Sequence, residues 1–459
     1  MEAVIKRLAA EQDKQMRELE TFLRYPSIST DPECATQVRA CAEYLLGRLQ
    51  AQGFAHTTLH ETAGHPIVTA EWRGTPGAPT VLLYGHYDVQ PVDPLDLWTT
   101  PPFEPALRDG RLYARGVADD KGQIFCHMKA LEALLAEHGR LPVNVVLLFE
   151  GEEEIGSPNL DAFLRSHKEL LACDCAVVSD TAMFAAGRPS ITYGLKGLCY
   201  LELEVTGPSH DLHSGSFGGP VVNPLNTLAM LLASLKDGQG RVAVAGFYDQ
   251  VLPLTDVERQ AFAALNFDVP GLMASLSVDA LSPEAGYTVL EHLWARPTCD
   301  VNGFSGGFTG TGAKTVLPAR AGAKVSFRLV PDQTPGEIAD LVEAHWRRLL
   351  PAGVTLTVTR HHSGKPALTP IDHPVVKTGM AALEQGFGVP PVYQREGGSI
   401  PIVAAFDEVL GVKTVLMGFG LPDSRCHSPN ENLSLENIFG GMRAAAWFYH
   451  LLPDAMAGA

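Results

Sequence analysis

Four short runs of apolar residues constrain the fold of this chain more than any other feature. They are rich in valine and leucine and occupy residues 81–84, 143–149, 176–178 and 412–417. Each run is too short for a buried helix, and its composition is typical of a strand covered on both faces. A helical pattern at 122–138, followed by Gly139, connects the first two runs. The order strand, helix, strand predicts an α/β domain with a helix-covered, mostly parallel sheet.

Each of these runs is followed by side chains that can bind a metal ion. His86 and Asp88 follow the first run, the acidic residues 152–154 follow the second, and Asp180 follows the third. His427 comes after a glycine-rich turn beyond the fourth run. Because ligands bind beyond the carboxyl ends of strands in open α/β sheets, we expect these groups to converge. His86 and Asp88 point the same way on an extended backbone, so Asp88 can orient the imidazole of His86.

Two acidic segments extend this set. Asp119 and Asp120 are consecutive carboxylates at the entry to the predicted helix, and a carboxylate with two free oxygens can bridge two cations. In the run Glu152, Glu153, Glu154, mutual repulsion costs stability unless cations compensate. Alone, each segment also fits a helix cap or a solvated acidic turn. Together with the histidines, the segments supply the mixed nitrogen and oxygen ligands of a two-zinc hydrolase.

The composition is that of a globular protein with two domains. With 459 residues the chain is longer than a domain with one hydrophobic core usually is, and 46% of the residues are hydrophobic. The net charge of −17, without a cluster of Lys and Arg, argues against nucleic acid or a membrane surface as partner. The amino-terminal residues lack the apolar core of a secretion signal, and the eight cysteines are scattered without the spacing of a zinc site. We therefore expect reduced thiols and a cytoplasmic protein.

A second domain is predicted at residues 194–371, where the pattern changes to α+β. Its alternating strands and striped helices are expected at 199–205, 323–330 and 354–360, and at 223–236 and 334–350. The prolines of the stretch 246–295 favour turns between short helices. The second domain interrupts the first, whose two parts are predicted at 1–193 and 372–459.

The segments that carry these residues resemble, in the same order, the motifs of the M20 metallopeptidases. They are residues 85–91, 115–122, 152–157, 178–180 and 426–431. The resemblance runs from about Tyr25 to the carboxyl-terminal helix and is strongest to the cytosolic nonspecific dipeptidase and carnosinase branch. It implies a catalytic domain with an inserted lid domain that also mediates dimerisation.

The resemblance further implies two divalent metal ions per subunit, Zn²⁺ in the first place and Mn²⁺ or Co²⁺ as alternatives. Asp119 would bridge the two ions. His86 and Asp180 would complete one site, and Glu154 and His427 would complete the other.

The resemblance also assigns the proton transfer. Glu153 would be the general base, taking a proton from the attacking water and passing it to the leaving amine, while Asp88 would orient the first histidine ligand. The run of three glutamates leaves Glu152 open as the base if the register is shifted by one position. The family often has a cis peptide after the bridging aspartate, here between Asp119 and Asp120.

In the inserted domain, residues 211–219 resemble the motif whose histidine enters the active site of the partner subunit of a homodimer. His213 would there donate a hydrogen bond to the tetrahedral oxyanion. The nearby His210 is an alternative candidate.

Arg328 of the same domain is expected to bind the substrate. Arg328 lies in a predicted strand, where an inward-facing guanidinium needs an anion, and the terminal carboxylate of a peptide fits its fork. An ion pair with a neighbouring glutamate of the same domain is the alternative. The dipeptidase branch suggests further contacts from Thr315, His362 and Ser399. His361 beside His362 makes that assignment ambiguous.

These observations predict a dimeric two-metal hydrolase that cleaves the amide bond of dipeptides or short peptides with a free carboxylate. An N-acyl amino acid deacylase of the same family is one alternative, because only the pocket for the amine side differs. A non-catalytic metal-binding dimer is another, against which the complete set of ligands and the base argues.

Overall fold

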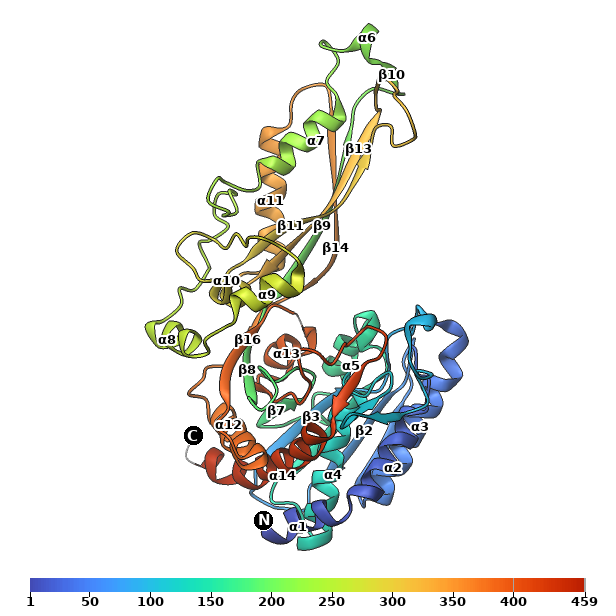
Figure 1. Ribbon diagram of the computed structural model, residues 1–459, viewed down its shortest axis with the longest axis vertical. Coiled ribbons are helices and arrows are strands. Elements are labelled where there is room, and N and C mark those ends of the chain that lie inside the picture. The colour runs from blue at the N-terminus through green and yellow to red at the C-terminus, as the bar shows by residue number, and fades with distance from the viewer. Residues whose placement is uncertain (399, 458–459) are drawn as a thin grey trace. The chain divides into compact units, whose positions relative to one another are not determined.

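The computed structural model describes residues 1–398 and 400–457 and divides the chain into two compact units. The first unit consists of Met1–Tyr193, Thr369–Gln394 and Ala405–Ala459, and the second of Gly194–Leu368 and Arg395–Ala404. Residues 395–404 therefore group with the second unit, although the sequence assigned them to the second part of the first domain. Figure 1 follows the chain through its elements from the amino to the carboxyl terminus.

The central sheet of the first unit is built on four parallel neighbours. In spatial order these are β6 (Asn144–Glu150), β3 (Thr80–His86), β7 (Cys175–Val178) and β17 (Thr414–Leu416). They coincide with the four apolar runs, so the predicted parallel sheet is confirmed. The antiparallel strands β1 (Ala55–His60) and β2 (Ile67–Trp72) extend it beyond β6, and β8 (Ser190–Leu195) follows β17.

Helices cover this sheet. They are α1 (Glu2–Ala10), α2 (Gln12–Leu23), α3 (Ala35–Ala51), α4 (Lys121–His138), α5 (Leu160–Ser166), α12 (Pro374–Phe387) and α14 (Leu435–Ala457). α3 packs on β1 and β2, α4 packs on β3, and α14 packs against both α4 and α12 (Figure 1). Gly122 in the first turn of α4 allows a close approach, because a Cβ there would meet the carbonyl oxygen of Val117 at 1.9 Å. The helix that follows Asp119 is thus pressed against the loop that carries this residue.

A small antiparallel sheet links two distant segments of the first unit. It consists of β4 (Ala106–Arg108), β5 (Arg111–Tyr113) and β18 (Asn432–Ser434). β18 pairs with β5 through Asn432 opposite Tyr113. This pairing places the segment after His427 beside the segment that leads to Asp119.

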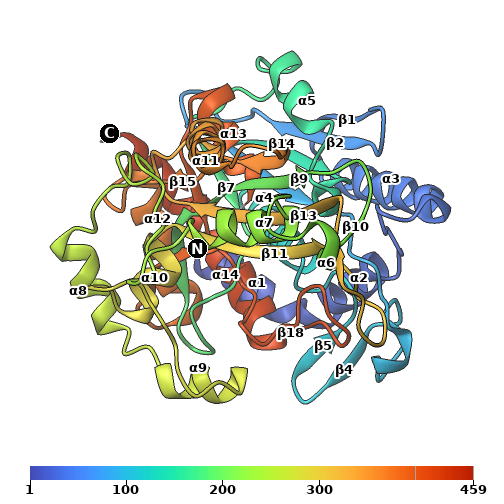
Figure 2. The same ribbon diagram turned by 90° about the horizontal axis from the view of Figure 1, so that it is seen from above.

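The second unit contains a four-stranded antiparallel sheet. In spatial order its strands are β11 (Thr298–Gly306), β13 (Arg320–Leu329), β9 (Gly197–Thr206) and β14 (Thr355–Gly364). Buried and partly exposed residues alternate along β9 and β13, as expected for strands with one covered face. The helices α7 (Pro224–Ala233) and α11 (Pro335–Leu349) pack on that face, and Figure 2 shows the four strands from above in the order β14, β9, β13, β11. The predicted α+β architecture is confirmed.

The stretch 246–295 forms short helices, as its prolines suggested. They are α8 (Asp256–Ala264), α9 (Val269–Leu276) and α10 (Val289–Ala295). The remaining short elements are η1 (Pro32–Cys34), η2 (Leu95–Leu97), η3 (Glu153–Ile155), β10 (Leu212–His213), α6 (Ser214–Phe217), β12 (Val316–Leu317), β15 (Ala367–Leu368), β16 (Val392–Glu396), α13 (Pro401–Ala405) and η4 (Phe406–Leu410). All eight cysteines are free thiols. Within the described ranges, every helix is too short or too polar to cross a membrane.

Candidate active site

The metal-type side chains converge at one edge of the central sheet of the first unit. Because β6, β3, β7 and β17 run in parallel, their carboxyl ends meet at the same edge. His86 is the last residue of β3, the acidic residues 152–154 follow β6, and Asp180 follows β7. Asp119 lies in the loop before α4, and His427 lies in the loop before β18. Every ligand predicted from the sequence therefore belongs to the first unit.

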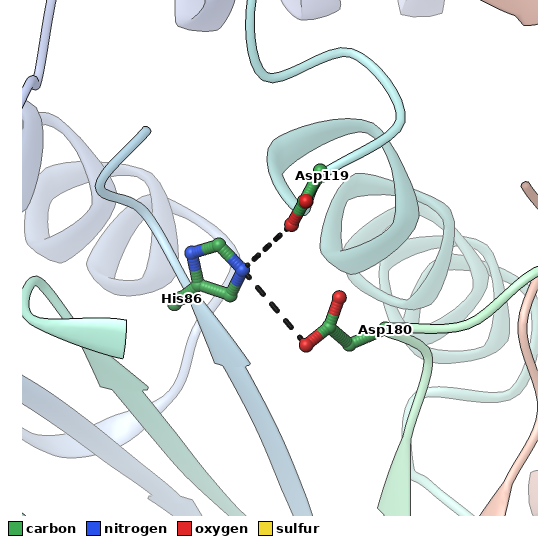
Figure 3. A group of neighbouring side chains, drawn as sticks. All are labelled: His86, Asp119 and Asp180. Carbon is green, nitrogen blue, oxygen red and sulfur yellow. Dashed lines mark hydrogen bonds and ion pairs between the residues drawn. The ribbon is translucent and has the colours of Figure 1, made fainter. Parts of the chain in front are cut away.

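The first group of candidate ligands consists of His86, Asp119 and Asp180 (Figure 3). The Nε2 atom of His86 lies 3.0 Å from Oδ1 of Asp119 and 4.0 Å from Oδ2 of Asp180. Figure 3 shows both carboxylates directed at this nitrogen from different elements. One ligand atom from each residue lies within 4.8 Å of the others. This separation fits a shared cation whose bonds to nitrogen and oxygen measure about 2 Å.

Asp119 also belongs to a second group, with Glu154 and His427. Its other oxygen, Oδ2, lies 2.9 Å from Nε2 of His427, and that nitrogen lies 3.4 Å from Oε2 of Glu154. Gln90 donates a hydrogen bond of 2.7 Å to the same oxygen of Glu154 and holds it in place. The two oxygens of Asp119 therefore face different groups.

Asp88 lies behind the first group and connects it to the acidic turn. Its Oδ1 atom is 3.3 Å from Nδ1 of His86, and both residues are fully buried. The backbone N–H groups of Glu153 and Glu154 donate hydrogen bonds of 3.2 Å and 3.1 Å to the two oxygens of Asp88. One carboxylate thus orients the imidazole and fixes the backbone of the glutamate turn. The spacing of Asp88 and His86 in the sequence had indicated the first of these roles but not the second.

The glutamates of the acidic turn lie in different environments. Glu152 is buried and accepts hydrogen bonds from the backbone N–H of His65, at 2.9 Å, and from Nδ2 of Asn159, at 2.8 Å. Glu153 is the first residue of η3, and its carboxylate interacts electrostatically with His86 and Asp119. Glu152 thus has its hydrogen-bond partners outside the two candidate ligand groups, whereas Glu153 interacts with residues of both.

Negative charge dominates the cluster. Burial, and next the charge of Asp119, raise the pKa of Glu154 to about 8. The same two causes raise the pKa of Asp180 well above its ordinary value. The hydrogen bond to Asp119 outweighs burial and raises the pKa of His427 to about 9. Carboxylates this crowded resist ionisation unless cations compensate, so the residues present fit a metal centre.

The loop that carries Asp119 is held by Glu431, a residue to which the sequence analysis gave no role. The peptide bond between Asp119 and Asp120 is cis, as the family resemblance implied. Glu431 is fully buried, and its Oε1 accepts hydrogen bonds from the N–H groups of Ala118, at 2.8 Å, and Asp119, at 3.1 Å. Its Oε2 accepts from the Arg115 guanidinium and from a further backbone N–H, at 2.8 Å and 2.9 Å.

Glu431 follows His427 closely in sequence and binds the loop of Asp119. It therefore connects the loop of His427 to the loop of the residue that both candidate ligand groups share. The position of an acid at the end of the motif 426–431 was the available signal. Its four acceptor contacts could not be foreseen, because all the donors lie more than 300 residues earlier in the chain.

Replacing Glu431 by Gln should weaken metal binding without touching a ligand. The amide NH₂ of Gln would face backbone donors, and the loss of charge-assisted hydrogen bonds in a buried site should lower the free energy of unfolding by about 2 kcal/mol. Zinc affinity and the thermal midpoint of the metal-free protein are the measurements. Glu436→Gln, at an exposed position of α14, is the matched control. Unchanged zinc affinity in Glu431→Gln would show that the loop is held without Glu431.

In the second unit, the structure brings His213 and Thr315 together. β10 pairs with β12 through His213 opposite Val316, and the N–H of Ser214 donates a hydrogen bond of 3.0 Å to the carbonyl oxygen of Thr315. The exposed ring of His213 accepts a hydrogen bond of 3.0 Å at Nδ1 from the N–H of Gly215. This contact places the proton of the neutral imidazole on Nε2, which is then a donor.

Arg328 lies in β13 of the second unit, opposite Thr298 of β11 and Leu198 of β9. Arg328 alternates along β13 with the buried Phe327 and Leu329, so it lies on the face of the sheet that α7 and α11 leave uncovered. Ser399, the last of the predicted substrate contacts, lies outside the described residues.

The two adjacent histidines of β14 have different neighbours. Nε2 of His361 lies 2.8 Å from a carboxylate oxygen of Glu202. The ring of His362 stacks on Tyr200 with the ring centroids 5.6 Å apart. His361 thus has an acidic partner within its own sheet, and the sequence-based preference for His362 as the substrate contact stays a prediction.

A parallel sheet whose strand ends bring two candidate sets of histidine and carboxylate ligands together around one aspartate is an arrangement suited to a metal-dependent hydrolase. The chain belongs to the peptidase family M20/M25/M40, whose family model matches residues 82–449. It is therefore a metallopeptidase, a hydrolase that acts on peptide bonds.

Relatives and solved structures agree with this assignment along nearly the whole chain. The chain is 33% identical to the Cys-Gly metallodipeptidase of Schizosaccharomyces pombe, over 96% of each sequence. It is 34% identical to the human Beta-Ala-His dipeptidase, over 84% of this chain and 77% of that protein. The M20 family metallo-carboxypeptidase from Sulfolobus solfataricus superposes with a TM-score of 0.84 at 36% identity, over 96% of this chain and 99% of that one. Human carnosine dipeptidase 1 gives 0.80 at 30% identity, over 99% and 98%.

Proposed function

We propose that this metallopeptidase hydrolyses the amide bond of dipeptides or short peptides that carry a free terminal carboxylate. The observation that carries the proposal is Asp119, whose two oxygens face two different groups of ligands. The names of its relatives, Cys-Gly metallodipeptidase and Beta-Ala-His dipeptidase, support small peptides as the substrate class. We further propose a cytoplasmic enzyme without nucleic-acid or membrane partners, in line with the excess of acidic over basic residues in its sequence.

Two divalent metal ions would be held by the two ligand groups, with Zn²⁺ proposed first and Mn²⁺ or Co²⁺ as alternatives. His86 and Asp180 would bind one ion, Glu154 and His427 the other, and Asp119 both. Mixed nitrogen and oxygen ligands of this kind suit zinc. When bound, the ions would polarise the scissile carbonyl and increase the acidity of the attacking water.

Glu153 is the proposed general base. Burial and the charge of Asp119 raise its pKa above the ordinary value, which suits a carboxylate that must accept a proton and release it again. Glu153 takes the proton of the attacking water and later passes it to the nitrogen of the leaving amine, so the carboxylate is regenerated in each turnover. Asp88 keeps Glu153 in place by accepting the hydrogen bond from its backbone N–H.

His213 is proposed to stabilise the oxyanion in the active site of the partner subunit of a homodimer. Its Nδ1 is occupied by the N–H of Gly215, so Nε2–H is the donor available for a developing negative charge. The exposed position of His213 at the start of α6 supports a role toward another molecule. His210, whose Nδ1 lies 2.9 Å from the hydroxyl of Ser209, stays the alternative.

Mixing two inactive variants tests this trans arrangement. His213→Ala and Glu153→Gln should each be inactive alone, but a heterodimer would contain one active site with both residues intact. Random exchange of subunits should restore about a quarter of the native activity, because half of the dimers are heterodimers with one complete site each. Recovery is measured after subunit exchange in mild denaturant. A mixture as inactive as its components would place His213 and Glu153 in the same subunit or exclude a role for His213.

Arg328 is proposed to bind the terminal carboxylate of the substrate, with Thr315, His362 and Ser399 as further contacts. Arg328→Met should raise KM for dipeptides about 100-fold, the loss expected for a bidentate charge-assisted pair, and change kcat much less. The same variant should discriminate little between a dipeptide and its carboxyl-terminal amide, whereas the native enzyme should prefer the free acid. Equal preference in both proteins would contradict the assignment.

A panel of dipeptides against N-acetyl and N-succinyl amino acids separates the proposed activity from that of a deacylase. The proposed enzyme turns over the dipeptides and leaves the N-acyl substrates nearly untouched. The reverse preference would refute dipeptide hydrolysis while leaving the metal centre intact.

A further inference from the structure

The second unit contains a cavity that none of the residues assigned above explains. Its volume is about 300 Å³, and it lies between α9, α10 and the first residue of β11. The walls are apolar and consist of Leu272, Leu276, Leu281, Pro283, Val289 and Leu293. Leu276 and Leu293 are 55% and 47% exposed, so large apolar surface borders the opening. A concave apolar space of this size with a few polar groups is typical of a small-molecule site.

The polar part of the cavity is formed by Lys196, Ser282, His292 and Thr298. Lys196 is only 3% exposed, and its ammonium donates a hydrogen bond of 3.1 Å to the carbonyl oxygen of His292. The hydroxyl of Thr298 is buried and has no hydrogen-bond partner among the described residues. Buried hydroxyls are normally paired, so this one indicates a group that binds there.

The charge of this region favours an anion. Arg328 lies directly opposite Thr298 in the sheet, on the same face, and adds a positive charge near Lys196. Arg296 adds another, whereas the acidic neighbour Asp300 acts on Lys196 in the opposite direction. Burial, and next the charge of Arg328, lower the pKa of Lys196 to about 7. A carboxylate beside the ammonium would offset both effects and favour its charged form.

We propose that this cavity binds a small molecule with an apolar body and a carboxylate head. Lys196 and the hydroxyl of Thr298 donate to the carboxylate, and the leucines of α9 and α10 enclose the body. Two kinds of molecule combine an apolar body with a carboxylate in this way. One is the carboxyl-terminal residue of a substrate held by Arg328, which rests on the function proposed above, and the other is a separate apolar acid.

Calorimetric titration of the full-length native protein with 4-phenylbutyrate and with its neutral amide tests the proposal. The acid should bind at least about tenfold more tightly than the amide, because only the acid forms charge-assisted hydrogen bonds. Lys196→Met should remove this difference, and Thr298→Val should reduce it. Leu293→Asn should weaken both ligands roughly fivefold, because part of the apolar wall is lost.

Leu252→Asn is the matched control, since Leu252 is 48% exposed and lies outside the cavity. Circular dichroism and thermal melting of each variant verify that it is folded. Equal affinity of the acid and the amide in the native protein, or unchanged binding in folded Lys196→Met and Leu293→Asn, would overturn the proposal. These binding measurements do not depend on peptide hydrolysis, so failure here and failure of the proposed function are distinguishable.

Steady-state kinetics identify the source. A substrate residue is the source if 4-phenylbutyrate raises KM for dipeptides without changing kcat, and if Leu293→Asn lowers kcat/KM selectively for dipeptides with a large apolar carboxyl-terminal residue. A separate ligand is the source if the probe binds without raising KM. In both cases the ligand occupies the same cavity, and its carboxylate makes the same contacts.

Discussion

Glu153→Gln should lower kcat by about 10²–10⁴-fold while leaving the metal content close to that of the native enzyme. Gln has the size of Glu but cannot accept the proton of the attacking water. Its backbone N–H, which binds Asp88, is unaffected by the substitution, so the turn should keep its conformation. The measurements are steady-state kinetics on a dipeptide and metal analysis of the purified variant.

Glu152→Gln is the control that decides the register. Glu152 is the neighbouring glutamate of the same turn, but its carboxylate accepts hydrogen bonds from His65 and Asn159. Its replacement should lower the thermal midpoint and keep kcat within about threefold, because no proton transfer depends on it. Full activity of Glu153→Gln together with loss of activity in Glu152→Gln would contradict the assignment of the base.

Asp119→Asn should abolish activity by removing both metal ions. Asn keeps the size of the side chain but has one oxygen and no charge, and both ligand groups share this residue. By contrast, Asp180→Asn alters one group only and should leave one tightly bound ion per chain. The metal content of each variant after gel filtration is the measurement.

Asp423→Asn is the control for these carboxylate substitutions. Asp423 lies in the loop before His427, its side chain is 68% exposed, and it forms an ion pair with Arg111. An exposed pair of this kind contributes at most about 1 kcal/mol, so metal content and activity should be retained. An Asp119→Asn protein that still binds two ions would show that the two groups do not depend on a shared carboxylate.

The parallel part of the fold could be predicted because its strands are buried on both faces. The residues of β3 and β6 form continuous apolar runs, and the sequence shows them directly. The edge strand β11 was missed because most of its residues are exposed, with Val301 and Phe304 at 50% and 55%, and so no apolar face marks it. The starts of α8 and α10 carried a signal that was not used, since Thr255 and Thr288 each form a capping box with a glutamate three residues later.

The candidate ligands could be predicted because parallel strands deliver their carboxyl ends to one edge. This rule locates His86 and Asp180 from the strands that precede them. The same rule does not locate side chains that act by accepting hydrogen bonds from backbone N–H groups. The link from Asp88 to the N–H groups of the glutamate turn, and the four hydrogen bonds of Glu431, depend on loop conformations that no periodicity encodes.

The roles of the second unit rest on different grounds. His213 was proposed from a motif, and the structure adds a local reason for its tautomer through Gly215. The polar groups of the cavity are separated by about 100 residues in sequence, Lys196 before β9 and Thr298 at the start of β11. Only the pairing of β9 and β11 with β13, one on each side of it, brings these two segments close together, which a sequence without strand register cannot show.

Titration of the metal-free enzyme with Zn²⁺ tests the central claim most directly. Bound zinc and dipeptide hydrolysis are measured on the same samples. Two ligand groups that share Asp119 predict saturation at two ions per chain, with full activity only after the second ion is bound. Full activity at one ion per chain, with no further zinc bound, would contradict a two-metal centre.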